Sequence, residues 1–467
     1  MFRRILIANR GEVAARVLRA CRRMGIETVA VYSSADRGSP HLELADISVC
    51  IGGSASKESY LNQNAILQTA LQYDCQAVHP GWGFLAENAL FARRCEQQKT
   101  TFIGPTPDLI TLMGDKARAK ETMEKAGLPL IPGSRGVLAD LEEARAIAQQ
   151  TGFPVLLKAR AGGGGKGMRI SRSLEELKEA YEQAHLEAEK SFGDGGLYLE
   201  RYLARGRHIE FQILADAFGQ AVHLGERECS VQRNHQKLIE ESPSPALSPA
   251  QREEMGTRVA RAVAEVGYRN AGTVEFLRDE QGHLYFMEMN TRLQVEHPVT
   301  EMITGIDLVE KQLGIAAHEP LTLRQDEVRF SGHAIECRIN AEDPFDDFRG
   351  SPGTITRFEP PPEVENGRCR LETHVRAGAV IPPYYDSMIG KLIARGETRA
   401  EAIEILICAL ERFRIEGVKT TIPLHLQILR SARFRAGEYD TGLVAELLAA
   451  DGGAGRERSD NSSGGSH

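Results

Sequence analysis

The sequence lacks the features that mark a secreted, membrane-spanning or nucleic-acid-binding chain. Its eight cysteines are scattered without a C-x-x-C pair, which argues against a disulfide framework or a zinc site and indicates reduced thiols in a cytoplasmic protein. No segment approaches the roughly 18 apolar residues of a membrane span, and the apolar run in MFRRILIANRG is too short for export. The net charge of -8 predicts no general attraction to nucleic acid or to an anionic membrane.

What the chain does contain is enough apolar sequence for about three domains of ordinary size. Residues 3–8, 11–24 and 27–32 follow the patterns of a strand, an amphipathic helix and a second strand. Such a βαβ unit predicts a parallel sheet in an N-terminal domain, which we place at residues 1–113. Its turn, ANRGE, has a single glycine, so the dinucleotide-binding fingerprint is absent.

Two further domains and a tail are predicted beyond this unit. Residues 114–330 open with the helical pattern MGDKARAKETMEKAG and contain strands suited to antiparallel pairing, HIEFQILAD with QAVHLGERE. Residues 331–448 alternate short strands with Pro-rich turns and then carry an amphipathic helix, RAEAIEILICALERF. Residues 449–467 are Gly, Ser and charge with nothing to bury, so we expect a disordered tail.

The glycine-rich stretch FPVLLKARAGGGGKGMRIS predicts a phosphate-binding loop of an unusual kind. A Rossmann loop must lead into a helix, whereas MRIS has the pattern of a strand. The P-loop motif also fails, because Arg160 replaces its first glycine and Gly167 follows Lys166. What remains is a flexible loop between two strands, with Lys158 before it, whose N–H groups can approach phosphates. A plain surface hairpin is the alternative.

Two acidic residues and an amide in GTVEFLRDEQGHLYFMEMN suggest a metal site. A four-residue turn at 279–282 would place Thr273 opposite Glu288, and Glu275 and Glu288 would then share one face. With Asn290 beside them they form an oxygen-rich site suited to Mg²⁺ or Mn²⁺. A register slip of one residue would put the two carboxylates on opposite faces.

The stretch FMEMNTRLQVEHP continues this polar pattern. If the strand stays extended past Asn290, Arg292 and Gln294 lie on the same face as an anion clamp, and Glu296 follows as a base. The alternative is the solvated face of a half-buried strand.

Basic residues gather nearby in ERECSVQRNHQKLIEE. Together they would neutralise a polyphosphate, although each alone suits an ordinary surface charge. They are Arg227, Arg233, His235 and Lys237, with Lys116 opening an earlier helix.

Eight motifs occur in an order that resembles biotin carboxylase, a family of ATP-grasp ligases, over residues 1–448. They are IANRGE (7–12), HPGWGFLAEN (79–88), MGDK (113–116), KARAGGGGKGM (158–168), QRNHQK (232–237), MNTRLQVEHPVTE (289–301), CRINAEDP (337–344) and PPYYDSMIGKL (382–392). The chain departs from the family at Arg160 and Ala161, at Trp82, and in the acidic loop EDPFDDFRGSPG.

The resemblance implies an α/β and α+β fold: an N-terminal doubly wound parallel-sheet domain, a central ATP-grasp domain with a mobile lid at about 130–203, and a C-terminal α+β domain. It also implies a reaction with ATP and Mg²⁺ or Mn²⁺. ATP phosphorylates bicarbonate to carboxyphosphate, which releases CO2, and the CO2 carboxylates N1 of biotin carried by another protein.

The resemblance assigns roles to residues of this sequence. ATP would be bound by Lys116, Lys158, Gly162, Gly163, Gly164, Gly165, Lys166, Gly167, Glu200, Leu203, His208, Gln232, His235 and Lys237. Bicarbonate would be held by Arg292, Gln294 and the Val295 N–H, and deprotonated by Glu296. Metal would bind Glu275, Glu288 and Asn290, Lys237 would stabilise the transferred phosphoryl group, and Arg338 would stabilise the biotin enolate.

The sequence shows no biotinyl-lysine motif and no room for a carrier domain after residue 448. We therefore expect a subunit, a homodimer by family resemblance, that works with a separate biotin carboxyl carrier protein and carboxyltransferase subunits. Acetyl-CoA carboxylase of fatty acid biosynthesis is one such assembly, and propionyl-CoA or pyruvate are other acceptors. An ATP-grasp ligase with another acceptor and a nucleotide-binding regulatory paralogue are the remaining alternatives.

Overall fold

The structure, a computed structural model, describes residues 1–160, 167–203 and 205–450. Most of the predicted glycine loop (161–166) and the predicted tail from 451 on lie outside the described residues. The chain divides into two compact units. The first comprises residues 1–114, 207–275 and 288 onward, and the second comprises residues 115–206 and 276–287.

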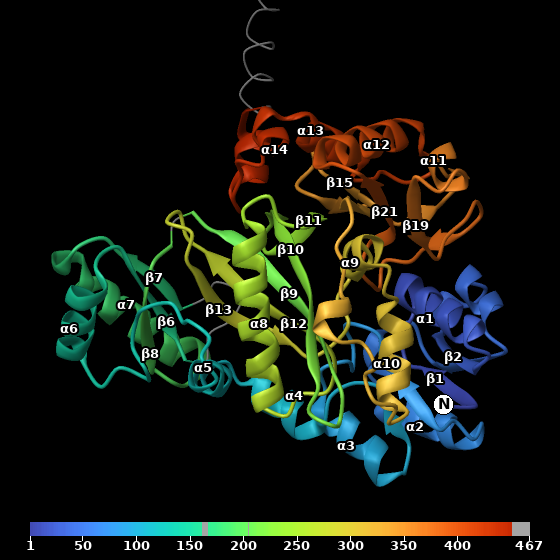
Figure 1. The fold of residues 1–467 in the computed structure, drawn as a ribbon, viewed down its shortest axis with the longest axis horizontal. Coiled ribbons are helices and arrows are strands. Elements are labelled where there is room, and N and C mark those ends of the chain that lie inside the picture. Colours follow the sequence, from blue (N-terminus) through green and yellow to red (C-terminus); the bar gives the residue numbers. More distant parts are fainter. Residues whose placement is uncertain (161–166, 204, 451–467) are drawn as a thin grey trace, which may run out of the picture. The chain divides into compact units, whose positions relative to one another are not determined.

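The first unit opens with the predicted doubly wound sheet, which is confirmed as five parallel strands in the order β3-β2-β1-β4-β5 (Figure 1). Its central strand, β1, is apolar on both faces and almost wholly buried, as expected where helices cover a parallel sheet on both sides. The strands are β1 (Arg4–Ile7), β2 (Glu27–Ser33), β3 (Ile47–Gly52), β4 (Ala77–His79) and β5 (Thr101–Phe102), and the helices are α1 (Gly11–Arg23), α2 (Gln63–Gln72), α3 (Ala89–Gln97) and α4 (Pro107–Gly114).

A larger sheet has the strand order β13-β12-β9-β10-β11-β14-β21-β19. The predicted pairing of HIEFQILAD with QAVHLGERE is confirmed, since β9 and β10 are antiparallel with Ala215 opposite Ala221. The strands are β9 (Arg207–Ala215), β10 (Ala221–Arg233), β11 (Gln236–Ser242), β12 (Asn270–Arg278), β13 (Leu284–Asn290), β14 (His333–Asn340), β19 (Cys369–Thr373) and β21 (Met388–Gly396).

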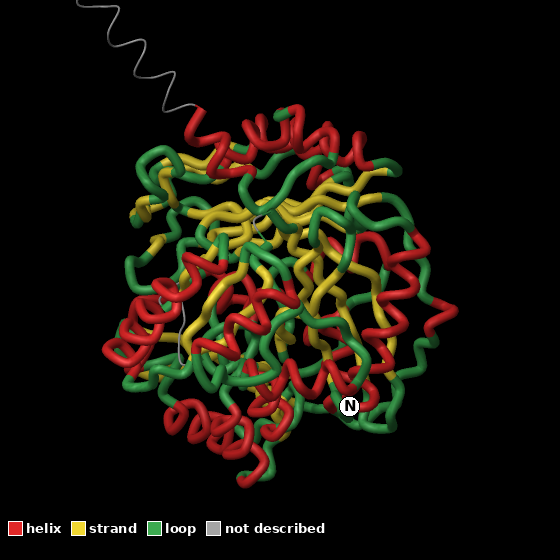
Figure 2. The backbone as a smooth tube through the Cα atoms, turned by 90° about the vertical axis from the view of Figure 1, so that its left-hand side faces the viewer, coloured by secondary structure: helices red, strands yellow, loops and turns green. Residues whose placement is uncertain are grey.

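Helices cover parts of this sheet. Helix α8 packs on β9 and β10, and α12 packs on β14 and β21. Figures 1 and 2 show the helices of residues 399–436 above the strands at the top of the molecule. The helices are α8 (Pro249–Glu265), α9 (His297–Thr304), α10 (Leu308–Ala316), α11 (Pro362–Glu365), α12 (Arg399–Arg412), α13 (Ile422–Arg430) and α14 (Ala432–Ala436).

Short elements complete the first unit. Three two-stranded ladders are formed by β15 (Glu342–Asp343) with β16 (Arg349–Gly350), β17 (Gly353–Thr354) with β20 (Val380–Ile381), and β18 (Arg357–Glu359) with β22 (Arg414–Glu416). Four 3-10 turns are η1 (Ser34–Asp36), η2 (Pro40–Leu44), η3 (Ser56–Glu58) and η4 (Gln325–Glu327).

The second unit contains a three-stranded antiparallel sheet in the order β7-β6-β8. Lys158 lies opposite Met168, so the two predicted strands on either side of the glycines are confirmed, and MRIS forms the second of them. The predicted lid falls within this unit. Its strands are β6 (Val155–Ala159), β7 (Met168–Ser171) and β8 (Leu197–Arg201), and its helices are α5 (Lys116–Lys125), α6 (Leu141–Thr151) and α7 (Leu174–Phe192).

The prediction that the chain stays extended past Asn290 is wrong. β13 ends at Asn290, and helix α9 begins at His297 with Pro298 in its first turn. Proline suits the first turn of a helix, because its missing N–H has no partner there in any case, so the tail of the motif turns into a helix. Gln294 and Glu296 therefore lie in a turn and not on a strand face.

The β12–β13 turn also differs from the expected one. The Asp279 amide donates to the His283 carbonyl at 2.9 Å, so His283 is paired with Asp279 and not with Arg278. Glu275 and Asn290, two of the three predicted metal ligands, still meet in the first unit, where the Asn290 amide donates to Glu275 at 2.8 Å.

The cysteines serve mainly as small apolar side chains. All eight are free, and most of them are buried in the cores. Within the described ranges, no helix has both the length and the apolar character that crossing a membrane requires.

Helix α2 offers a matched test of this core. Leu67 is 1% exposed and Leu71, one turn later, is 47% exposed. Leu67→Ala should lower the free energy of unfolding by about 2–5 kcal/mol through the cavity it leaves. Leu71→Ala should change it by less than about 0.5 kcal/mol. Urea unfolding followed by circular dichroism measures both, and equal losses would contradict the assigned burial.

Candidate active site

The centre of the site is the ammonium group of Lys237 on β11, which lies among three buried carboxylates. Its Nζ is 2.6 Å from Glu210, 2.6 Å from Glu296 and 3.2 Å from Glu275. Burial disfavours the charge, but Cys229 and these carboxylates hold the pKa of Lys237 well above its ordinary value. The side chain keeps 11% exposure, so the cation is fixed in place and still accessible.

A tight hairpin places this lysine. Residues Asn234 and His235 have positive φ of 48° and 66°, as in the two-residue turns that match the twist of paired strands. The turn puts Gln232 on β10 directly opposite Lys237 on β11. Two predicted ATP-binding residues are therefore neighbours, whereas His235 is exposed at the tip of the hairpin.

Glu296 joins the lysine to the predicted biotin-binding arginine. One carboxylate oxygen accepts from Lys237 at 2.6 Å, and the other accepts from Arg338 of β14 at 2.8 Å. Burial favours the neutral acid, but Lys237, Arg338 and Arg227 outweigh it and lower the pKa of Glu296. The carboxylate is therefore ionised at neutral pH, as a general base must be.

Arg338 is itself held by a second acid that we did not predict. Its Nε donates to Glu240 on β11 at 2.6 Å. Burial raises the pKa of Glu240, while Arg338 acts in the opposite direction. The guanidinium thus lies between Glu240 and Glu296.

The predicted anion clamp is assembled around Arg292. Its Nε donates to Glu87 at 2.9 Å and its Nη2 donates to Asn290 at 3.0 Å. Glu87 also accepts from the backbone amide of Thr291 at 3.0 Å. Glu87 belongs to the motif HPGWGFLAEN, and nothing in the local sequence pattern predicts this contact.

Gln294 faces the same carboxylate cluster. Its amide nitrogen donates to Glu275 at 2.8 Å, and its oxygen is 3.4 Å from the Lys237 ammonium. The predicted nucleotide contact His208 also joins the cluster, with Nε2 3.0 Å from Glu275.

Two of the oxygen ligands predicted for a divalent metal, Glu275 and Asn290, are in contact. Asn290 contacts Glu275, and Glu288 shares a face of β13 with Asn290 because side chains alternate along a strand. Carboxylate and amide oxygens suit Mg²⁺ or Mn²⁺, so the donor set fits such an ion. His208, Glu210 and Glu275 form a second group whose ligand atoms lie within 4.8 Å of one another.

The prediction that Arg227 neutralises a polyphosphate is wrong. Its side chain is fully buried and donates to Glu210 at 2.5 Å and to Gln212 at 2.7 Å. Arg233 also points elsewhere, pairing with Asp347 at 2.5 Å and stacking on Phe348 at 4.3 Å. Arg227 instead holds the carboxylate cluster from within, while the acidic loop contacts Arg233.

The remaining predicted ATP-binding residues that are described belong to the second unit. There Glu200 on β8 accepts from Lys158 at 2.5 Å and also pairs with Lys120, which we did not predict. Lys116 is exposed at the start of α5, as expected, and Leu203 is half-buried. Gly167 is described with a positive φ of 73°, whereas 162–166 lie outside the described residues.

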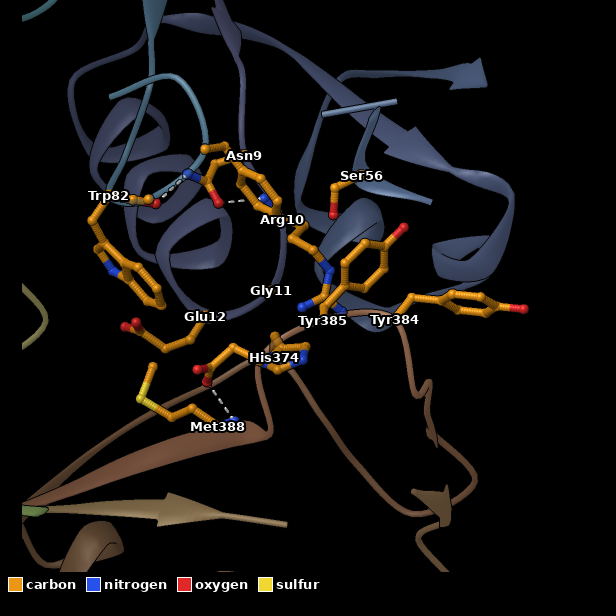
Figure 3. Close-up of a pocket in the computed structure, with 13 residues that line it drawn as sticks. Asn9, Arg10, Gly11, Glu12, Ser56, Trp82, His374, Tyr384, Tyr385 and Met388 are labelled. Carbon is orange, nitrogen blue, oxygen red and sulfur yellow. Dashed lines mark hydrogen bonds between the residues drawn. The ribbon is translucent and has the colours of Figure 1, made fainter. Parts of the chain in front are cut away.

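A cavity of about 350 Å³ lies near two motifs of the N-terminal sheet, IANRGE and HPGWGFLAEN (Figure 3). Glu12, Trp82, His374 and Met388 are among its lining residues. Asn9 supports the Trp82 segment by donating to the Trp82 carbonyl at 2.8 Å.

These features define the class of the protein. A doubly wound parallel domain is followed by an antiparallel unit, in which a glycine-rich stretch of sequence separates two strands, and by a sheet that bears a Lys, Glu and Arg cluster. This is the fold of an ATP-grasp ligase with its flanking domains.

Comparisons with known proteins narrow this class. The family model described as "Biotin carboxylase, N-terminal domain" matches residues 1–110, and "Biotin carboxylase C-terminal domain" matches 336–446. Between them, "Carbamoyl-phosphate synthase L chain, ATP binding domain" matches 115–324. The description of the middle model names carbamoyl-phosphate synthase, whereas those of the two flanking models name biotin carboxylase.

Individual relatives agree over nearly the full length. A biotin carboxylase of Nostoc sp. is 53% identical over 448 residues, covering 96% of this chain and 99% of the relative. The 2-oxoglutarate carboxylase small subunit of Hydrogenobacter thermophilus is 52% identical over 446 residues, covering 96% and 94%. The biotin carboxylase domain dimer of that carboxylase, crystallised with MgADP, ADP and bicarbonate, matches with a TM-score of 0.87 at 51% identity, covering 96% and 99%.

The chain belongs to the biotin carboxylase family. It is an enzyme, an ATP-dependent ligase that carboxylates biotin with bicarbonate. This conclusion removes the alternative of a regulatory paralogue and that of a ligase with another acceptor.

The structural role of Arg227 can be tested against Arg233 on the same strand. Arg227→Met leaves the buried Glu210 with one cation fewer, so it should cost about 3–5 kcal/mol of unfolding free energy. Arg233→Met should cost about 1 kcal/mol or less, because its partner Asp347 is 93% exposed. Thermal and urea unfolding of both variants measure the difference, and similar losses would show that Arg227 does not support the cluster.

Proposed function

We propose that Glu296, Lys237 and Arg338 carry out successive parts of the biotin carboxylation reaction. The observation that supports this assignment is the single carboxylate of Glu296 held between the other two, at 2.6 Å from Lys237 and 2.8 Å from Arg338. A base that contacts both cations can act where the phosphoryl group is transferred and where biotin is activated.

In the first part, bicarbonate is held by Arg292, Gln294 and the Val295 N–H. Glu296 removes its proton, which turns a weak nucleophile into one that attacks the γ-phosphorus of ATP. Lys237 stabilises the charge on the transferred phosphoryl group, since phosphoryl transfer depends mainly on positioning and charge neutralisation. Carboxyphosphate then separates into CO2 and phosphate.

In the second part, the phosphate released from carboxyphosphate takes the proton from N1 of biotin, and Arg338 holds the ureido oxygen as an enolate while N1 attacks CO2. Arg338 is prepared for an oxyanion because it is fixed by Glu240 at 2.6 Å and remains charged. Arg338 and Glu296 now satisfy each other as an ion pair. As phosphate leaves and biotin approaches, new contacts with these two groups would take the place of part of that pairing.

ATP and Mg²⁺ or Mn²⁺ complete the reaction. A bound divalent ion would neutralise phosphate charge, and Glu275, Glu288 and Asn290 would supply its oxygen ligands. We assign nucleotide binding to the residues that the family resemblance indicates. They are Lys116, Lys158, the loop from Gly162 to Gly167, Glu200, Leu203, His208, Gln232, His235 and Lys237.

We also retain the three-domain division at residues 1–113, 114–330 and 331–448, with a lid at about 130–203. A closing lid would keep CO2 and carboxyphosphate from water.

The partners follow from the substrate. Biotin in this reaction is carried on a biotin carboxyl carrier protein, and carboxyltransferase subunits would accept the carboxyl group. Dimer formation is supported by the relative that was crystallised as a dimer. The final acceptor is set by the transferase, and 2-oxoglutarate, named for the Hydrogenobacter relative, joins acetyl-CoA, propionyl-CoA and pyruvate as a candidate.

The role of Glu296 predicts a specific loss. Glu296→Gln keeps the shape of the side chain but removes the base, so bicarbonate-dependent ATP hydrolysis should fall by about 10²–10⁴-fold. ATP binding, measured by calorimetry, should change little. Glu254→Gln, on the exposed side of α8, is the control and should retain full activity.

The same assay includes free biotin. Wild-type turnover should require bicarbonate and rise with biotin. Bicarbonate-dependent turnover that biotin does not stimulate, or full activity of Glu296→Gln, would overturn the assigned roles.

A further inference from the structure

Two consecutive carbonyl groups immediately before the base are held by buried side chains. His297 Nδ1 lies 2.8 Å from the Gln294 oxygen, and Lys391 Nζ lies 2.7 Å from the Val295 oxygen. In a trans peptide the carbonyl of one residue and the N–H of the next point in opposite directions. Fixing the Gln294 carbonyl therefore fixes the Val295 N–H, and fixing the Val295 carbonyl fixes the peptide that carries Glu296.

Lys391 is an unusual residue for this task because its side chain is 0% exposed. It lies on β21 directly opposite Arg338 on β14. Residues paired in this way share a face of the sheet, so the lysine and the biotin-binding arginine are neighbours. From β21, Lys391 supports the turn by donating to the Val295 carbonyl, and from β14, Arg338 contacts the Glu296 carboxylate.

The lysine is held by an acid from a distant part of the sequence. Glu12, at the start of α1, has a carboxylate oxygen 3.1 Å from Lys391 Nζ, and both side chains are buried. Apart from this ion pair, neither Glu12 oxygen has a hydrogen-bond partner in the described part of the chain. Figure 3 shows Glu12 at the cavity, beside Trp82 and Met388.

This contact joins two motifs that the reaction does not otherwise use. Glu12 belongs to IANRGE, and Lys391 belongs to PPYYDSMIGKL. A buried ion pair is weak evidence for stability, because apolar side chains of similar size often serve as well or better. The hydrogen bond from Lys391 to the Val295 carbonyl is the one contribution that an apolar side chain could not replace.

We propose that Lys391 is a positioning residue that orients the Val295–Glu296 peptide for bicarbonate, and that Glu12 holds the lysine in place. The proposal rests on the function assigned above to Val295 and Glu296. Lys391 itself contacts neither substrate in this role, and its effect passes through the backbone.

The test separates bicarbonate from ATP. Lys391→Met removes the donor and keeps a chain of similar length. Displacing the turn should lower kcat/KM for bicarbonate roughly 10- to 100-fold, as small misplacements of reacting groups do. The KM for ATP and the calorimetric affinity for ADP should stay within about twofold, because the lysine acts only on the bicarbonate turn.

Three further variants keep the test decisive if the unpaired Glu12 of Lys391→Met disturbs folding. Glu12→Gln with Lys391→Met removes both charges, so this double variant should fold and still show the bicarbonate defect. Glu12→Gln alone retains the amine on the Val295 carbonyl and should lose less than about fivefold. Lys391→Arg, which restores a donor, should recover part of the kcat/KM lost in Lys391→Met.

The outcomes distinguish this inference from the proposed function. Wild-type ATP hydrolysis without bicarbonate dependence would overturn the proposed function itself. Normal wild-type behaviour together with an unchanged bicarbonate kcat/KM in the double variant would overturn only the role of Lys391. A folded double variant that loses kcat/KM for bicarbonate and also shows a similarly raised KM for ATP and weakened ADP binding would likewise overturn it. Such a general loss would indicate a structural role.

Discussion

The structure depends most on the balance of charge around Lys237. Glu210, Glu275 and Glu296 are buried within a short distance of one another and would repel strongly without cations between them. Lys237 and Arg227 supply that charge in different ways. Arg227 is enclosed and bonded on all sides, whereas Lys237 stays at the edge of the cluster, where its ammonium can also meet a phosphoryl group.

The residues that we propose for catalysis, and the acid that holds Arg338, are ordered mainly by the sheet. Lys237, Glu240 and Arg338 come from the neighbouring strands β11 and β14, and Glu296 comes from the turn that leads into α9. Neighbouring strands lie about 4.8 Å apart, so Glu240 and Arg338, which share a face, come within reach of each other without a flexible loop. Such rigid placement suits a reaction in which the base must contact two cations in turn.

Much of the fold could be predicted from local patterns. The βαβ start, the β9–β10 pair and the strands around the glycine loop each follow from periodicity and turn residues over a few neighbouring positions. The prediction failed after Asn290, because alternating residues in TRLQVEHP suggested a strand while Pro298 favours the first turn of a helix. Gln294 and Glu296 still meet at one cluster, because a turn can bring both residues to it.

The sequence by itself determined which chemical groups were available: carboxylates, an amide, an arginine and a lysine in motifs that occur in a fixed order. It also determined most strands and helices, because those depend on neighbouring residues. Only the tertiary structure decided which cation is fully enclosed and which stays partly exposed, as Arg227 and Lys237 show. It alone brought Glu87 to Arg292 and Glu12 to Lys391, because contacts between residues hundreds of positions apart depend on how the elements pack.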